Sequence, residues 1–153
     1  MPQKLTETDG RYLKLIYRRQ VEEGRKVGNT EIAEVFDVRP ATVTGTLQKL
    51  AEKNILGYEP YRGVELTKQG LSEARLLLRS HRLLETLLVD HLKFEVQEAC
   101  REASRLDYYT SKDLIDKICR TYGHPKLCPC NKPIFPSKDA TKPNSTNEER
   151  LSD

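Results

Sequence analysis

Apolar residues recur three and four positions apart along most of the chain, which is the spacing of one face of a helix. A first helix is indicated by Tyr12, Leu13, Ile16, Tyr17 and Val21. A short second helix is predicted over residues 31–36, with Thr30 as its N-cap, because a threonine hydroxyl can accept from a free N–H of the first turn. A third helix begins at Pro40, whose missing N–H costs nothing in a first turn. Its buried stripe consists of Val43, Leu47 and Leu50.

The pattern changes after Asn54, where apolar and polar residues alternate. Residues 55–60 and 64–67 have the character of two short strands. The tight turn Tyr61-Arg62-Gly63 joins them and carries an arginine at its tip. Three helices followed by a small hairpin is the element order of a winged helix-turn-helix.

Helical spacing returns over residues 68–92, and further helices are predicted over 95–107 and 111–122. The apolar stripe of the long helix is wider than one small domain needs, which suggests a partner surface. Residues 137–153 are polar and are expected to be disordered. The predicted fold is therefore mainly α. It has an N-terminal winged helix-turn-helix with a β-hairpin wing (1–68), an all-helical dimerisation domain (69–136) and a polar tail (137–153).

Composition excludes several classes of protein. The 153 residues are 37% hydrophobic and 32% charged, with a net charge of +3. No apolar run approaches the ~18 residues of a membrane helix, and the N-terminus lacks the apolar core of a signal peptide. A cytoplasmic protein with no membrane partner is expected. The chain contains no nucleophile elbow, phosphate loop, dinucleotide fingerprint or zinc-protease motif, so we expect no enzyme.

The third helix is the candidate for reading DNA, because a major groove admits one α-helix whose outer side chains meet the base edges. Threonine can hydrogen-bond a base or touch a thymine methyl, Gly45 removes bulk, and basic residues contact phosphates. The predicted DNA-binding residues are Arg39, Ala41, Thr42, Thr44, Gly45, Thr46, Gln48, Lys49, Tyr61 and Arg62. Lys53 is also predicted to contact a phosphate. The alternative interpretation is a small helical core with a solvated polar face.

Several of these segments resemble the DtxR/MntR family of metal-dependent repressors. The likeness lies in residues 30–34, 39–44 and 47–50, in the wing 58–67, and in His81-Arg82-Leu83-Leu84-Glu85, which matches an H-x-L-x-E signature. Weaker matches occur at 102–107 and 128–134, so about residues 6–136 take part. The resemblance implies a homodimeric repressor of metal-homeostasis genes that binds a double-stranded DNA operator. The SH3-like third domain of the family is not expected, because the chain ends in polar residues.

The resemblance also implies a divalent metal (Fe²⁺, Mn²⁺ or Zn²⁺) held between the first helix and the dimerisation helices. The candidate ligands are His81, Glu85, Cys100 and Asp107. Imidazole and thiolate together favour zinc or iron(II) over manganese. The alternative for His81 and Glu85, four residues apart on one helix face, is a hydrogen bond or a dimer contact.

Other ligand positions of the family carry residues that do not fit a metal. Arg11 and Lys14 occupy those of the first helix, and Ser104 and Tyr108 those of a later one. A protonated arginine or lysine repels a divalent cation. We therefore also predict that the arginine or lysine side chain could pair with Glu85 or Asp107 in place of the metal. The protein would then be insensitive to metal.

A second group of potential ligands lies near the C-terminus, at Cys119, His124, Cys128 and Cys130. Three thiols and an imidazole suit tetrahedral zinc, and an iron–sulfur cluster would need a further ligand. Thiol redox sensing is another option. The alternatives are a core role for Cys119 and no role for Cys130. Two further functions stay open for the whole chain: a metal-insensitive or redox-sensing regulator, and a winged-helix protein-interaction module.

Overall fold

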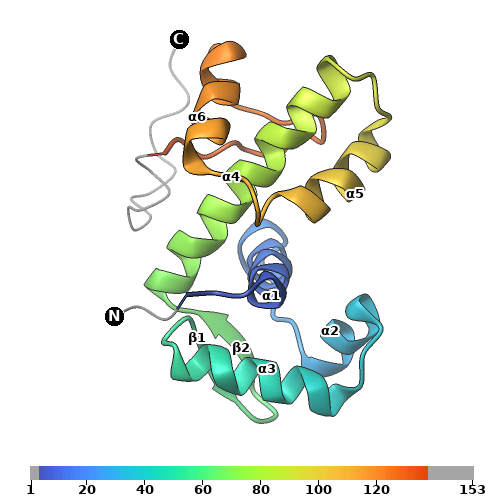
Figure 1. The fold of residues 1–153 in the computed structure, drawn as a ribbon. Helices are drawn as coiled ribbons and strands as arrows, with labels where there is room; N and C mark the ends of the chain where they lie inside the picture. Colours follow the sequence, from blue (N-terminus) through green and yellow to red (C-terminus); the bar gives the residue numbers. More distant parts are fainter. Residues whose placement is uncertain (1–3, 138–153) are drawn as a thin grey trace.

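A computed structural model describes residues 4–137, so the predicted tail lies almost wholly outside the described residues. The elements in chain order are α1 (Glu7–Tyr17), the π-helical turn η1 (Arg18–Glu22), α2 (Asn29–Phe36), α3 (Pro40–Glu52), β1 (Leu56–Glu59), β2 (Gly63–Leu66), α4 (Lys68–Asp90), α5 (Val96–Leu106) and α6 (Lys112–Thr121). The mainly helical class and the winged helix-turn-helix order are confirmed (Figure 1).

The N-terminal half is organised around α1, which lies between α4 on one side and α3 with the wing on the other (Figure 1). Thr6 caps α1 through a capping box, in which its hydroxyl accepts from Asp9 N–H at 3.1 Å and the Asp9 carboxylate accepts from Thr6 N–H at 2.9 Å. Strands β1 and β2 pair antiparallel, with Leu56 opposite Leu66 and Glu59 opposite Gly63. The wing predicted from alternation therefore forms.

The second helix begins differently from the prediction. Its N-cap is Gly28, and no side chain caps it, so the predicted capping role of Thr30 is wrong. The helix starts at Asn29, whose side-chain amide instead donates to the Thr44 hydroxyl at 2.8 Å and to the Tyr58 hydroxyl at 3.1 Å. One side chain thus ties α2 to both α3 and the wing.

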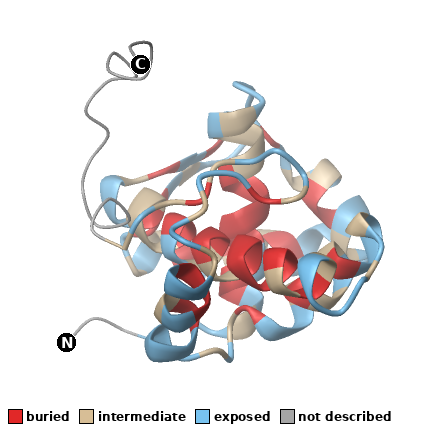
Figure 2. Ribbon diagram, turned by 90° about the horizontal axis from the view of Figure 1, so that it is seen from above, coloured by how far each residue is buried: buried red, intermediate tan, exposed pale blue. Residues whose placement is uncertain are grey.

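Helix α4 belongs to two hydrophobic cores at once. Ala74 and Leu78 close the core of the N-terminal half, whereas Leu83, Leu84 and Leu88 build a second core with α5 and α6. Figure 2 shows buried positions, coloured red, gathered along the helices in the middle of the molecule. The wide apolar stripe predicted to meet a partner is therefore used mostly inside the chain, because one helix serves both cores.

Gly70 fixes how α4 leaves the wing. A Cβ at this position would lie 2.0 Å from the backbone oxygen of Ile55, a contact that no side chain can make. Thr67 caps the helix, and its hydroxyl accepts from Gly70 N–H at 3.1 Å. The backbone of the DNA-binding half therefore lies directly against the first turn of α4.

Residues beyond α6 fold back along α4. Arg82 donates to the Pro133 carbonyl at 2.7 Å, and Arg79 donates to the Phe135 carbonyl at 2.9 Å. Arg82 also pairs with Glu22 of η1, so the returning segment, α4 and the end of the first helix meet at one point. Within residues 4–137, no helix is both long and apolar enough to cross a membrane.

Candidate nucleic-acid interface and metal centre

Helix α3 turns its apolar stripe inward and its polar face outward. Val43, Leu47 and Leu50 are fully buried in the N-terminal core. The outer positions are exposed at Ala41, Thr42, Gln48 and Lys49 and half-buried at Thr44, Gly45 and Thr46. A Cβ added to Gly45 would meet no atom within 4 Å, so this part of the helix surface is open.

The three outer threonines have different partners. The Thr44 hydroxyl donates to Pro40 O at 3.1 Å and accepts from Asn29, and the Thr46 hydroxyl donates to Thr42 O at 3.1 Å. Neither the Thr42 hydroxyl nor the Gln48 amide has a hydrogen-bond partner among the residues described. Thr42 and Gln48 are therefore the outer side chains whose hydrogen-bonding groups are available to a ligand.

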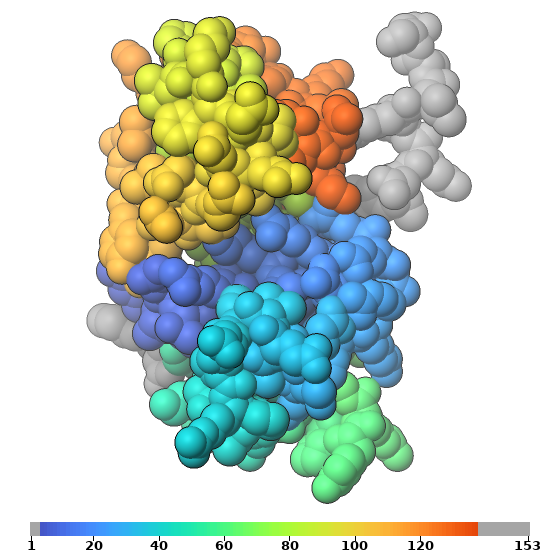
Figure 3. Space-filling model, turned by 90° about the vertical axis from the view of Figure 1, so that its right-hand side faces the viewer, coloured from blue at the N-terminus to red at the C-terminus, as the bar shows by residue number. Residues whose placement is uncertain are grey.

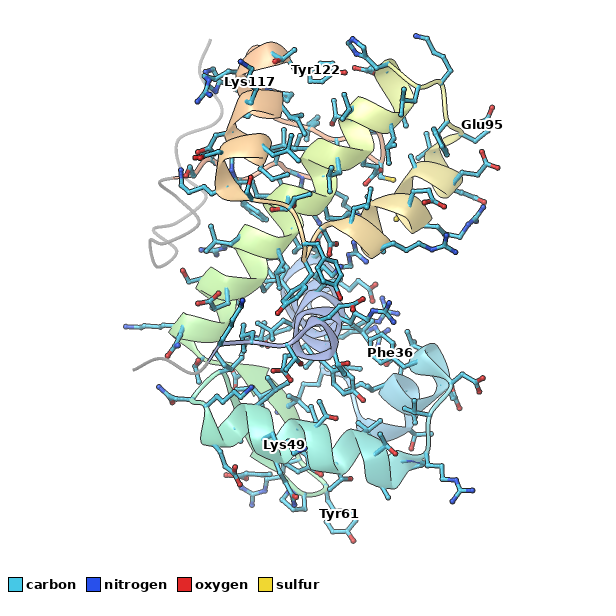
Figure 4. The ribbon with its side chains drawn as sticks, viewed as in Figure 1. Phe36, Lys49, Tyr61, Glu95, Lys117 and Tyr122 are labelled. Atoms are coloured by element: carbon cyan, nitrogen blue, oxygen red, sulfur yellow. The ribbon has the colours of Figure 1, made fainter. Side chains whose placement is uncertain are left out.

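Basic and aromatic residues border this helix. Arg39 and Lys49 are exposed, and the wing turn carries Tyr61 and Arg62. Figures 3 and 4 show the wing at the same end of the molecule as α3, with Tyr61 pointing outward beyond Lys49. Lys53 is not available as predicted, since its ammonium is held by Asp9 at 2.8 Å, which joins α3 to α1.

Helices α4 and α5 bring three of the four predicted metal ligands together. His81 and Glu85 lie one turn apart on α4, and Cys100 comes from the facing side of α5. A ligand atom of each lies within 4.8 Å of the other two. His81 Nε2 is 3.4 Å from Glu85 Oε2 and 3.5 Å from Cys100 Sγ. His81 and Glu85 are each only 1% exposed.

Asp107, the fourth predicted ligand, lies on the other side of the imidazole. Its Oδ2 is 3.1 Å from His81 Nδ1, so the structure does not group it with the other three. The same carboxylate forms a buried ion pair with the Lys14 ammonium of α1. Asp107 therefore orients the histidine ring and leaves Nε2 directed at Glu85 and Cys100, which is how carboxylates commonly support metal-binding histidines.

Lys14 forms the predicted ion pair with Asp107, whereas Arg11 pairs with neither Glu85 nor Asp107. The Arg11 guanidinium is exposed and pairs with Glu7 at 3.1 Å. The other poorly suited family positions also have protein partners. Ser104 donates to the Cys100 carbonyl at 2.9 Å, and Tyr108 donates to the Leu5 carbonyl at 2.8 Å.

The protonation of this cluster follows from its contacts. Burial disfavours the charged imidazole, but hydrogen bonds to Asp107, Cys100 and Glu85 outweigh it and raise the pKa of His81 to about 9. The hydrogen bond with His81 lowers the pKa of the Cys100 thiol. Burial raises the pKa of Glu85, yet its bonds with His81 and Cys130 bring it below the usual value.

Sequence reasoning missed one charge beside this cluster. Arg18, the first residue of η1, adds a positive field that acts on Lys14, His81, Glu85 and Cys100, and it offsets a small part of the rise in the pKa of His81. The spacing of Lys14 and Arg18, four residues apart on one continuous helical run, could have indicated that both face the same site.

The predicted C-terminal tetrad is not assembled. Cys119 Sγ lies 3.4 Å from His124 Nδ1, and Cys119 is buried in the second core. Cys128 and Cys130 instead lie beside Glu85, and the Cys130 thiol donates to Glu85 Oε1 at 2.7 Å. The reason is the chain path: His124 adopts a left-handed conformation (φ 57°) and the following residues turn back over α4.

The comparisons with known proteins match this architecture. Residues 4–64 match the description "Iron dependent repressor, N-terminal DNA binding domain", and residues 67–136 match "Iron dependent repressor, metal binding and dimerisation domain". The chain belongs to the iron-dependent repressor family. This family consists of transcriptional repressors, which are not enzymes, and the expectation that the chain is not an enzyme is confirmed.

Individual relatives agree with this assignment. An uncharacterised HTH-type transcriptional regulator of Methanocaldococcus jannaschii is 32% identical over 107 residues, which are 70% of this chain and 86% of that protein. The iron-dependent repressor IdeR of Mycobacterium tuberculosis is 32% identical over 131 residues, 86% of this chain, which spans only 56% of that repressor. A manganese-dependent transcriptional repressor solved in complex with manganese has a TM-score of 0.79 at 32% identity, covering 84% of this chain and 59% of that one.

Proposed function

We propose that this protein is a cytoplasmic, homodimeric repressor that binds operator DNA through α3 and the wing and responds to a divalent transition metal. The observation that carries the proposal is the set of His81, Glu85 and Cys100, in which the first two side chains are buried and the third is half-buried. Relatives that bind iron or manganese, and the match of residues 67–136 to a metal-binding and dimerisation domain, support it.

The donor set fits a soft divalent ion. It offers an imidazole nitrogen, a thiolate and a carboxylate, a mixture that suits zinc or iron(II) better than manganese. An ion held by His81 and Glu85 of α4 and by Cys100 of α5 would supply positive charge between these two helices. His81 would hold it at Nε2 while Asp107 keeps Nδ1–H engaged, and the Lys14–Asp107 pair connects this arrangement to α1. Metal favours the DNA-binding state only if it binds that state more tightly.

On the DNA side, α3 would lie in the major groove. Thr42 and Gln48 would read base edges, while Arg39, Lys49 and Arg62 would contact phosphates. Arg62 is held only by Glu59 at 3.4 Å on the surface, so it can turn toward a duplex. Two copies would present two such helices to one operator, because symmetric dimers read half-sites about one helical turn apart.

The test is selection of bound DNA fragments from the genome, with and without a chelator, followed by titration of the selected operator. Enrichment of one sequence in the presence of zinc, iron(II) or manganese, lost with chelator, is the expected result. Arg62→Ala should weaken binding to operator and random DNA alike and should reduce the salt slope by about 1 per subunit. No sequence enrichment under either condition would favour a protein-interaction module.

A second candidate function, a metal-independent repressor, is supported by the Lys14–Asp107 pair. The lysine ammonium already supplies a positive charge between α1 and the end of α5. In that case operator affinity would be high without metal. A metal-induced rise in operator affinity of tenfold or more, about 1.4 kcal/mol, would eliminate this candidate.

A further inference from the structure

We infer that a C-terminal strap, residues 132–135, fixes the angle at which the DNA-binding half sits on α4, and that Phe135 is its main positioning residue. The strap enters both hydrophobic cores at two consecutive positions. Ile134 is buried in the second core, whereas Phe135 packs against the core of the N-terminal half. Figure 1 shows this red-orange segment crossing α4 after it returns from α6. A segment that packs into both cores opposes movement of one core against the other.

The Phe135 ring packs against side chains of α4 and α1. The guanidinium groups of Arg75 and Arg82, two turns apart on α4, lie 5.8 Å and 5.6 Å from the ring centroid. Tyr17, the last residue of α1, meets the ring edge-on at 5.9 Å between centroids. A cation is attracted to the face of an aromatic ring, and an edge-on pair is an arrangement that two rings prefer. Phe135 is therefore fixed in direction as well as in position.

Polar contacts fasten the strap to η1, the turn that ends the first helical run. One carboxylate oxygen of Glu22 pairs with Arg82, and the other lies 3.6 Å from the Lys132 ammonium. In the same turn, the Gln20 side chain accepts from Leu66 N–H at 2.8 Å. Leu66 is the last residue of β2 in the wing. The strap is therefore connected to the wing through side chains of one short turn.

The strap holds one end of the first helical run, and the end of α5 holds the other. Tyr108 donates to Leu5 O at 2.8 Å just before α1, and Lys14 within α1 pairs with Asp107. Helix α1 has 11 residues and η1 has 5, so the run is roughly 24 Å long at about 1.5 Å per residue. A body held at one point can rotate about it, and a second fixed point prevents that rotation. Without the strap, a swing of about 10° would move the η1 end by about 4 Å.

The consequence of this angle for DNA rests on the proposed function. Helix α3 and the wing belong to the half that would swing, and two copies must present α3 to half-sites at a fixed separation. A movement of about 4 Å is close to the ~3.4 Å that one base pair adds along a duplex. Loss of the Phe135 anchor should therefore remove the distinction between operators whose half-sites differ in separation by one base pair.

The experiment measures the angle on the full chain and without DNA. Spin labels are attached to non-natural amino acids at Glu52 of α3 and Lys117 of α6, two exposed positions, so that the native cysteines stay unlabelled. An excess of unlabelled chain keeps the measured distances within one subunit. We expect a narrow distance distribution for the unaltered chain, and Phe135→Ala should widen it by about 4 Å. Circular dichroism of each variant verifies that it is folded.

Matched variants separate this role from general loosening. Phe135→Leu keeps apolar volume but offers no ring to the two guanidinium groups, so it should also widen the distribution, whereas Phe135→Tyr keeps the ring and should leave it narrow. Leu127→Ala lies on the same returning segment but is 56% exposed, and it should change nothing. A label pair at Arg101 and Lys117, both in the second half, should stay narrow in every variant.

The second readout is the ratio of operator Kd values at the best half-site separation and at one base pair more. In Phe135→Ala this ratio should come within about twofold of 1, while affinity for a single half-site is retained. Folded Phe135→Ala and Phe135→Leu with the distance distribution of the unaltered chain would overturn the inference. Widened distances with an unchanged ratio would refute the effect of the strap on operator reading. If no chain enriches an operator, the proposed function fails, and the distance measurement still decides whether the strap fixes the angle.

Discussion

Replacing Lys14 by methionine tests the central ion pair of the molecule. The Lys14 side chain is 7% exposed and that of Asp107 is 2% exposed, so the substitution leaves a carboxylate buried with His81 as its remaining partner. Removing one member of a buried pair typically costs about 3–5 kcal/mol, because the other charge loses its compensation. Total stabilities are about 5–15 kcal/mol, so much of the fold's stability is at stake.

The measurement is urea unfolding of the metal-free protein at pH 7, with Lys53→Met as the matched control. Lys53 also pairs with an aspartate, but Asp9 keeps its hydrogen bond from Thr6 N–H when the lysine is removed, so this loss should cost about 1–2 kcal/mol. Adding Asp107→Asn to Lys14→Met removes the uncompensated charge and keeps an acceptor for His81 Nδ1–H. The double variant should recover about 2 kcal/mol or more of the loss.

The reasoning fails if Lys14→Met costs no more than Lys53→Met, or if the effects of Lys14→Met and Asp107→Asn simply add. A second readout concerns metal. With the ammonium gone, the position beside Asp107 no longer repels a cation, so operator binding by Lys14→Met should depend more strongly on metal than that of the unaltered chain.

Three further predictions concern other parts of the molecule. Thr42→Ala should weaken operator binding by about 1–3 kcal/mol with little effect on binding to random DNA. Thr44→Ala should chiefly lower the free energy of unfolding, by about 1 kcal/mol, because the Thr44 hydroxyl is hydrogen-bonded within the protein. Gel-shift titrations measure the first effect and thermal unfolding measures the second. Gly70→Ala should destabilise by more than about 2 kcal/mol in calorimetry, because its Cβ meets backbone at Ile55, while Gly45→Ala should be tolerated. Folding raises the pKa of His81 to about 9, so the stabilising effect of its protonation is complete below pH 6.5 and is lost as pH rises toward 9. The free energy of unfolding of the metal-free protein should therefore fall by of order 3 kcal/mol across that range. The same dependence on pH in His81→Gln would contradict this prediction.

The fold was largely predictable because its signals are local. Pro40 marks the start of α3, and the three-four spacing of Val43, Leu47 and Leu50 gives its buried face. The start of α2 was not predictable in this way. Thr30 has the chemistry of a cap, but Asn29 begins the helix and its side chain ties together α3 and the wing, a tertiary interaction that propensity does not report.

The candidate site was predictable only in part. His81 and Glu85 share a helix face, so their spacing alone brings them together. The partnership of Glu85 with Cys130 spans 45 positions and depends on the path of the chain after His124, which has no local signal. The prediction that Cys119, His124, Cys128 and Cys130 form one ligand group was wrong for the same reason. The turn at His124 separates Cys119 from Cys128 and Cys130, although these residues are close in sequence.

Helix α4 connects the two halves without a linker. Its 23 residues form a rod about 34 Å long, with Gly70 wedged against the wing at one end and Glu85 near the other. Such a rod acts as a lever: a tilt of about 5° around the turns that carry His81 and Glu85 moves the far end by about 2–3 Å. Displacements of that size, doubled by symmetry, decide whether two helices fit grooves spaced one turn apart, so small rearrangements around Glu85 have large mechanical consequences.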